Sequence, residues 1–176
     1  TPLYMAAFNG HKDVVDALIA AKADVNKAET TRGDTPLFTA AFSGYKDVVD
    51  ALIAAEADVN TARSNGATPL YVAAQNGHKD VVDALIAAKA DVNKAETSDR
   101  ATPLFMAAAE GHKEEVEAVL AGKGVDNKGQ RIHKKTPLHI AAENGHTDEP
   151  ERVLAAKAEE HSDGPCETAT LLQYVS

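Results

Sequence analysis

The triplet Thr-Pro-Leu occurs five times in this chain of 176 residues, beginning at residues 1, 35, 68, 102 and 136. Successive triplets are therefore 33 or 34 residues apart. Residues 1–30 and 68–97 are identical except at Met5/Val72 and Phe8/Gln75. A fixed period of this length indicates an array of short repeats, in which each unit contacts only its neighbours. We expect residues 1–176 to form one elongated domain of five stacked units.

Each unit contains two stretches with helical spacing of apolar residues. Thr1 can cap the first helix, Pro2 suits its first turn, and Gly10 ends it. A second helix is expected from residue 12 to about residue 21. The apolar stripes of the first unit are Leu3, Ala6 and Ala7 in the first helix and Val14, Val15, Leu18 and Ile19 in the second. Neither helix can bury its stripe alone, so neighbouring units must stack.

The shared pattern TPLxxAAxxGHxxVVxxLxxxxADVN resembles the ankyrin repeat, and the resemblance covers nearly the whole chain. It implies an all-α solenoid of stacked helix-turn-helix pairs with projecting β-hairpin-like fingers. Thr170 lies one period after Thr136, which predicts a degenerate C-terminal cap at about residues 163–176. The resemblance also suggests hydroxylation of Asn26, Asn60 and Asn93, although turn-stabilising hydrogen bonds explain these residues more simply.

Three departures from the family pattern carry predictions. The glycine that usually follows the second helix is replaced by Lys22, Glu56, Lys89, Lys123 and Lys157. We predict positive φ at Lys22, Glu56 and Lys89, at a cost of about 1 kcal/mol each. The histidine after Thr-Pro-Leu becomes Tyr4, Phe38, Tyr71 and Phe105 and returns only as His139, so rings should pack along the stack. Three linking loops carry one extra residue, so the finger tips at residues 30–34, 97–101 and 130–135 should protrude or bulge.

The two ends of the chain differ. In the fifth unit, Glu149 and Pro150 stand where earlier units have Val-Val. If Thr147 caps that helix, Pro150 lies in its first turn, where proline is tolerated. A shorter, more polar helix then closes the stack. The first unit has no polar cap, so we expect it to present an apolar face and the native protein to continue upstream.

Composition excludes several classes of function. The net charge is −9, from 27 acidic and 18 basic side chains. This argues against binding to nucleic acid or to an anionic membrane, both of which need clustered lysine and arginine. Cys166 is the only cysteine, so no intrachain disulfide forms. We expect a reducing, cytoplasmic location.

The chain carries no motif for catalysis, metal or cofactor, so we expect neither an enzyme nor a cofactor. His11, His78, His112 and His146 share one repeat position that is Tyr45 in the second unit, which favours a structural role. His139 and Glu143 supply two metal ligands without a third, and Cys166 lacks a partner that would activate it. The basic run at residues 128–135 could grip an anion, but a solvated finger tip explains it more simply.

Variation among the units is concentrated at the end of the first helix and in the finger. In ankyrin-like stacks these two sets line one concave groove, the usual partner-binding surface. The alternative is neutral drift of a solvated surface. Phe8 and Phe42 should point into the groove as anchors, unless they pack against the adjacent finger. The predicted partner-binding residues are Met5, Phe8, Asn9, Arg32, Asp34, Thr39, Phe42, Ser43, Ser64, Asn65, Val72, Gln75, Asn76, Asp99, Met106, Glu110, His133, Lys135, Glu143 and Asn144.

The sequence therefore predicts a protein-protein interaction module. Its groove should run from an apolar N-terminal half to an acidic C-terminal half, which suits a partner with an apolar patch flanked by basic residues. The alternative is a structural spacer without a dedicated partner, which the near-identity of the units favours. The uncapped first unit could also mediate end-to-end self-stacking.

Overall fold

A computed structural model describes residues 1–97, 100–122 and 136–146. Several predictions therefore lie outside the described residues. They concern partner-binding residues Asp99, His133 and Lys135, the glycine-replacing Lys123 and Lys157, the tip at residues 130–135, the basic run at 128–135, Pro150, Cys166 and the cap at 163–176.

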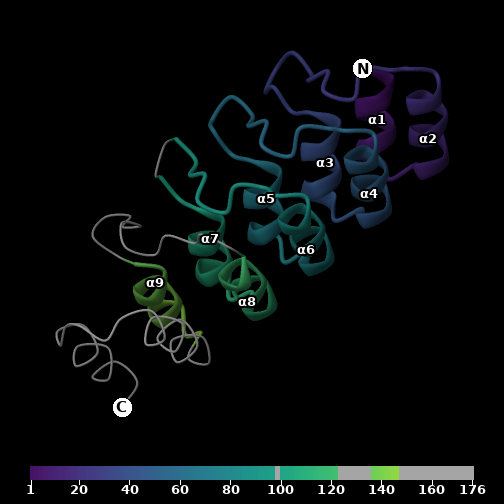
Figure 1. Ribbon diagram of the computed structural model, residues 1–176. Coiled ribbons are helices and arrows are strands. Elements are labelled where there is room, and N and C mark those ends of the chain that lie inside the picture. Colours follow the sequence, from purple (N-terminus) through teal and green to yellow (C-terminus); the bar gives the residue numbers. More distant parts are fainter. Residues whose placement is uncertain (98–99, 123–135, 147–176) are drawn as a thin grey trace.

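Within the described ranges, the helices form two rows that run side by side along the array (Figure 1). We call the units repeats 1 to 5, beginning at Thr1, Thr35, Thr68, Thr102 and Thr136. The first helices of the repeats are α1 (Pro2–Phe8), α3 (Pro36–Ser43), α5 (Pro69–Gln75), α7 (Pro103–Glu110) and α9 (Pro137–Glu143). The second helices are α2 (Lys12–Ala20), α4 (Lys46–Ala54), α6 (Lys79–Ala87) and α8 (Lys113–Ala121). Each first helix packs on the next first helix, and each second helix packs on the next second helix.

The predicted threonine caps are confirmed in the first four repeats. The hydroxyl of Thr35 accepts a hydrogen bond from the backbone N–H of Phe38 at 3.1 Å, and Thr1, Thr68 and Thr102 do the same three residues ahead. In repeat 5, the Oγ1 of Thr136 lies 2.7 Å from Nδ1 of His139. Proline follows each cap, where its missing N–H leaves no helical bond unmade.

Small side chains and one leucine per first helix build the core. Leu3, Leu37, Leu70 and Leu104 are no more than 1% exposed. The alanine pairs beside them are almost fully buried as well. Because an alanine side chain is a single methyl group, neighbouring helices can approach closely, and the contact area is supplied by the stack rather than by any single repeat.

The predicted positive φ values after the second helices are confirmed. Lys22, Glu56 and Lys89 have φ of 62°, 61° and 65°. Each N–H donates back into the preceding helix; that of Lys22, for example, donates to the carbonyl of Ile19 at 2.8 Å. The left-handed turn is therefore retained without glycine, because these hydrogen bonds fix the helix end.

The fingers are held by hairpin-type hydrogen bonds, although the described residues contain no regular strand. The N–H of Glu29 donates to the Asp34 carbonyl at 2.9 Å, and the equivalent bond in repeat 2 joins Arg63 to Ala67 at 3.0 Å. Neighbouring fingers are also joined, since the N–H of Ser64 donates to the Arg32 carbonyl at 2.9 Å. The projecting loops lie on the side of the first-helix row (Figure 1).

Two ladders of side chains tie each repeat to the next. The Nε2 of His78 donates to the Phe42 carbonyl at 3.0 Å, and its ring lies so close to Gly44 that a Cβ there would be 2.7 Å away. His112 and the Gln75 carbonyl make the corresponding contact at 3.1 Å. The predicted structural role of this histidine column is thus observed directly.

The Asp-Val-Asn turns form the second ladder. The Oδ1 of Asn26 accepts from the Asp58 N–H at 2.9 Å, and that of Asn60 accepts from the Asp91 N–H at 2.8 Å. These asparagines are therefore explained by hydrogen bonds between repeats.

Candidate interaction surface

Most of the described residues predicted to contact a partner are at least partly exposed. We call this set the candidate surface. Those classed as exposed are Met5, Phe8, Asn9, Arg32, Phe42, Ser64, Asn65, Glu110, Glu143 and Asn144, and those half-buried are Ser43, Gln75, Asn76 and Met106. They come from the ends of the first helices and from the fingers.

Three predicted contact residues are buried instead. Asp34, Thr39 and Val72 are 7%, 4% and 3% exposed. Thr39 and Val72 occupy the repeat position of Met5, which is 53% exposed because no described repeat packs in front of it. The prediction missed this because that position faces the preceding repeat. These three residues are thus buried within the stack and are not part of the candidate surface.

The apolar part of the surface lies on repeats 1 and 2. Phe8 and Phe42, one repeat apart, are 46% and 47% exposed. The Phe8 ring stacks on Tyr4 of the same helix, with centroids 6.4 Å apart and an interplanar angle of 16°. Tyr45, which sequence reasoning treated only as a histidine substitute, is also among the exposed large apolar residues. Its ring lies against Gly10 and extends the patch between the two repeats.

Asparagines at the ends of the first helices have a second task. The Nδ2 of Asn76 donates to the Phe42 carbonyl at 2.9 Å, and that of Asn144 donates to the Ala109 carbonyl at 2.7 Å. One amide hydrogen of each side chain is therefore committed to the stack.

A buried ion pair joins the first two fingers. The Nε of Arg63 lies 3.1 Å from Oδ1 of Asp34, and its guanidinium carbon lies 5.1 Å from the centroid of the Phe38 ring. Burial raises the pKa of Asp34, while the positive charge of Arg63 opposes that rise. Two of the rings predicted to pack along the stack are buried, since Phe38 is 2% and Phe105 is 7% exposed.

The tip of the first finger is organised by Glu29. Its carboxylate accepts from the backbone N–H of Thr31 at 2.8 Å and from that of Arg32. These hydrogen bonds, Thr31 first, lower the pKa of Glu29 to about 2. The charged carboxylate therefore fixes the tip on which the exposed Arg32 lies.

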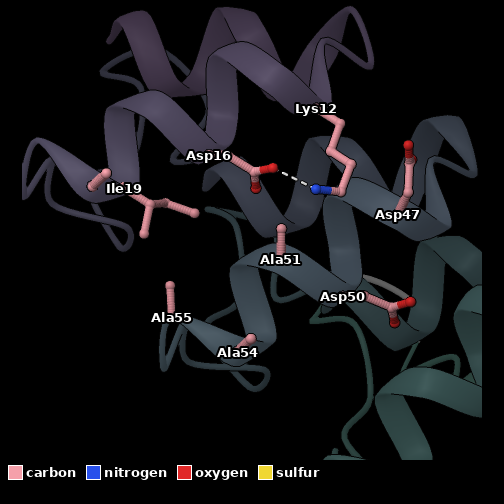
Figure 2. A pocket seen from close by; sticks show the side chains of 9 residues that line it. Lys12, Asp16, Ile19, Asp47, Asp50, Ala51, Ala54 and Ala55 are labelled. Carbon is pink, nitrogen blue, oxygen red and sulfur yellow. Dashed lines mark hydrogen bonds and ion pairs between the residues drawn. The ribbon is translucent and has the colours of Figure 1, made fainter.

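A hollow of about 580 Å³ lies on the other row of helices, between α2 and α4 (Figure 2). Sequence reasoning did not find it. The lining residues are Lys12, Asp16, Ile19, Ala20, Asp47, Asp50, Ala51, Ala54 and Ala55. The only available signal was that three second helices share the sequence KDVVDALIA.

Within the described ranges, no group of three or more histidine, cysteine, aspartate or glutamate side chains could hold a metal ion. None of the helices in this part of the chain is long and apolar enough to span a bilayer. The site geometry consists of exposed apolar, polar and acidic side chains on a rigid stack.

Comparison with known proteins gives one result. The family model described as ankyrin repeats (3 copies) matches residues 3–96 and again residues 90–159. No curated protein matches the chain.

Proposed function

This chain belongs to the ankyrin-repeat family, whose members are generally protein-protein interaction modules, and we propose that it binds a protein partner through the candidate surface. The observation that carries the proposal is the exposure of Met5, Phe8 and Phe42 on adjacent first helices. Large apolar side chains held half-exposed on a rigid scaffold are typical interface anchors. The stacked helices fix these side chains before binding, which lowers the entropic cost of association.

The partner's chemistry follows from the distribution of charge. The apolar anchors lie on repeats 1 and 2, whereas the exposed Glu110 and Glu143 lie on repeats 4 and 5. A partner with an apolar patch flanked by lysine or arginine matches both ends. Neither nucleic acid nor membrane is proposed as a partner, and no catalysis is assigned. We place the protein in the reducing cytoplasm because it carries a single cysteine.

A pull-down tests the proposal. The wild-type chain is compared with the Phe8→Ala, Phe42→Ala double variant in an extract of cells that express the protein. The matched control is Val14→Ala, which removes an exposed apolar side chain from α2 rather than from the candidate surface. A protein retained by the wild type and by the control, but lost by the double variant of equal thermal stability, supports the proposal.

The second candidate function is a structural spacer. The identity of α2, α4 and α6 favours it, because repeated duplication lengthens an array without creating a specific surface. A spacer has no partner to lose, and its stability rises with repeat number. Absence of any stoichiometric partner in the pull-down favours this function.

End-to-end association is a further part of the proposal. Val14 and Met5 are 49% and 53% exposed on the side of repeat 1 that no described residue covers. A contact between this face and another molecule is heterologous and can propagate. Light scattering over a range of protein concentrations tests it, and a strictly monomeric mass at high concentration rules it out.

A further inference from the structure

The hollow between α2 and α4 has an apolar floor. Ile19 and Ala20 come from α2, and Ala51, Ala54 and Ala55 come from the end of α4 and the residue after it. Figure 2 shows Ile19 facing the alanines of the neighbouring helix across the hollow. Because the alanine side chains are short, the space above them is not filled by the protein itself. The floor therefore suits an unbranched aliphatic chain.

Carboxylates surround one end of this floor. Asp16 is paired with Lys12, and Asp50 is paired with Lys46. Asp47 differs, since it makes no ion pair with any residue in the described ranges. Its Oδ1 accepts only the N–H of Val48, at 2.9 Å. Counting these three acids against two lysines leaves one uncompensated negative charge at the rim.

The surface around the hollow is the least variable part of the first three repeats. The exposed Asp13, Asp47 and Asp80 occupy one position in helices that are otherwise identical. Substitutions at exposed positions of this kind usually change stability little. The first helices of the same repeats differ at several positions, so common descent of the repeats does not by itself explain the contrast.

We propose that this hollow binds a lysine side chain presented by a partner protein, with its aliphatic stem on the alanine floor and its ammonium group at Asp47. A lysine side chain has both properties that the hollow requires, a four-carbon stem and a compact terminal charge. The contact is independent of the candidate surface, because it lies on the second-helix row. It adds a second attachment point on the opposite face of the array.

A methyl NMR titration tests this directly. The protein carries ¹³C-labelled alanine methyl groups, and the probe is a short serine-glycine peptide with a single central lysine. We expect the methyl signals of Ala51, Ala54 and Ala55 to shift as peptide is added. The same peptide with norleucine in place of lysine keeps the stem but lacks the ammonium group, so it should produce clearly smaller shifts.

Variants separate the charge from the fold. Asp47→Asn keeps an acceptor for the Val48 N–H but removes the charge, and it should weaken lysine-peptide binding about threefold, as expected for an exposed ion pair. The matched control is Asp13→Asn, the same change one repeat earlier and outside the hollow. This control and the Phe8→Ala, Phe42→Ala variant should bind like the wild type.

Three results overturn the proposal. The first is an equal response to the norleucine peptide, and the second is an equal loss in Asp13→Asn and Asp47→Asn, which indicates only general attraction to an acidic protein. The third is a set of shifted methyl groups that lies outside the hollow.

Discussion

Repeat 1 and repeat 3 have almost the same sequence and very different surroundings. Val14 is 49% exposed, whereas its counterpart Val81 is 1% exposed. The cap, however, is the same, because the hydroxyls of Thr1 and Thr68 each accept a backbone hydrogen bond at 3.1 Å. The turn after the second helix is also the same, with φ of 62° at Lys22 and 65° at Lys89. Local geometry thus follows sequence, whereas burial follows from the neighbouring repeat.

The largest expected difference between the two repeats comes from their valines. Val81→Ala removes buried methyl groups between α4 and α6 and should lower the free energy of unfolding by about 2 kcal/mol. Val14→Ala removes the same groups from an exposed position and should change it by less than about 0.5 kcal/mol. Chemical denaturation of both variants measures the contrast, and equal losses would contradict the assignment of burial to the stack.

The finger contact should give the next largest effect. Asp34 of the first finger is paired with Arg63, whereas the third finger has Ala101 in place of Asp34. Arg63→Ala leaves the Asp34 carboxylate without its cation and removes the contact with the Phe38 ring, so we expect a loss of about 1.5 kcal/mol, reduced by partial exposure.

The Asp34→Ala, Arg63→Ala double variant is the control for this pair. It should be no less stable than Arg63→Ala alone, because it removes the unpaired carboxylate. A double variant whose loss equals the sum of the two single losses would show that the pair is not coupled.

Glycine at the left-handed positions should produce a smaller effect that is the same in both repeats. Lys22→Gly and Lys89→Gly each relieve the strain of a positive φ, so each should raise stability by about 0.5 kcal/mol. Thermal unfolding of the two variants measures this. Unequal changes would mean that the stack, rather than local geometry, sets the strain.

The smallest expected effect is the pH dependence of the first finger. The pKa of Glu29 is about 2, below its ordinary value of 4.5. Because the folded chain binds this proton more weakly than the unfolded chain, the carboxylate stabilises the fold above the unfolded pKa. This contribution is lost as pH falls through the folded value.

The stability difference between wild type and Glu29→Gln should therefore narrow between about pH 5 and about pH 2. Urea denaturation at several pH values measures it. A constant difference across that range would show that the hydrogen bonds to Thr31 and Arg32 do not depend on the charge.

Features that depend on a few adjacent residues could be predicted from the sequence. The threonine caps and the positive φ at Lys22, Glu56 and Lys89 belong to this class. The contact residues were harder, because Met5 and Val72 share one position in the repeat but differ in exposure from 53% to 3%. The hollow also escaped prediction, since its lining comes from two helices whose separate patterns indicate only solvated faces and packing alanines.

The sequence by itself determined the repeat length, the helix boundaries and the family, because hydrogen bonds within one repeat and the spacing of its apolar residues decide them. The tertiary structure alone decided which copy of a residue is buried, that Arg63 pairs with Asp34, and that Asp47 has no cation beside it. These properties depend on side chains about one repeat apart, which meet only when the repeats stack.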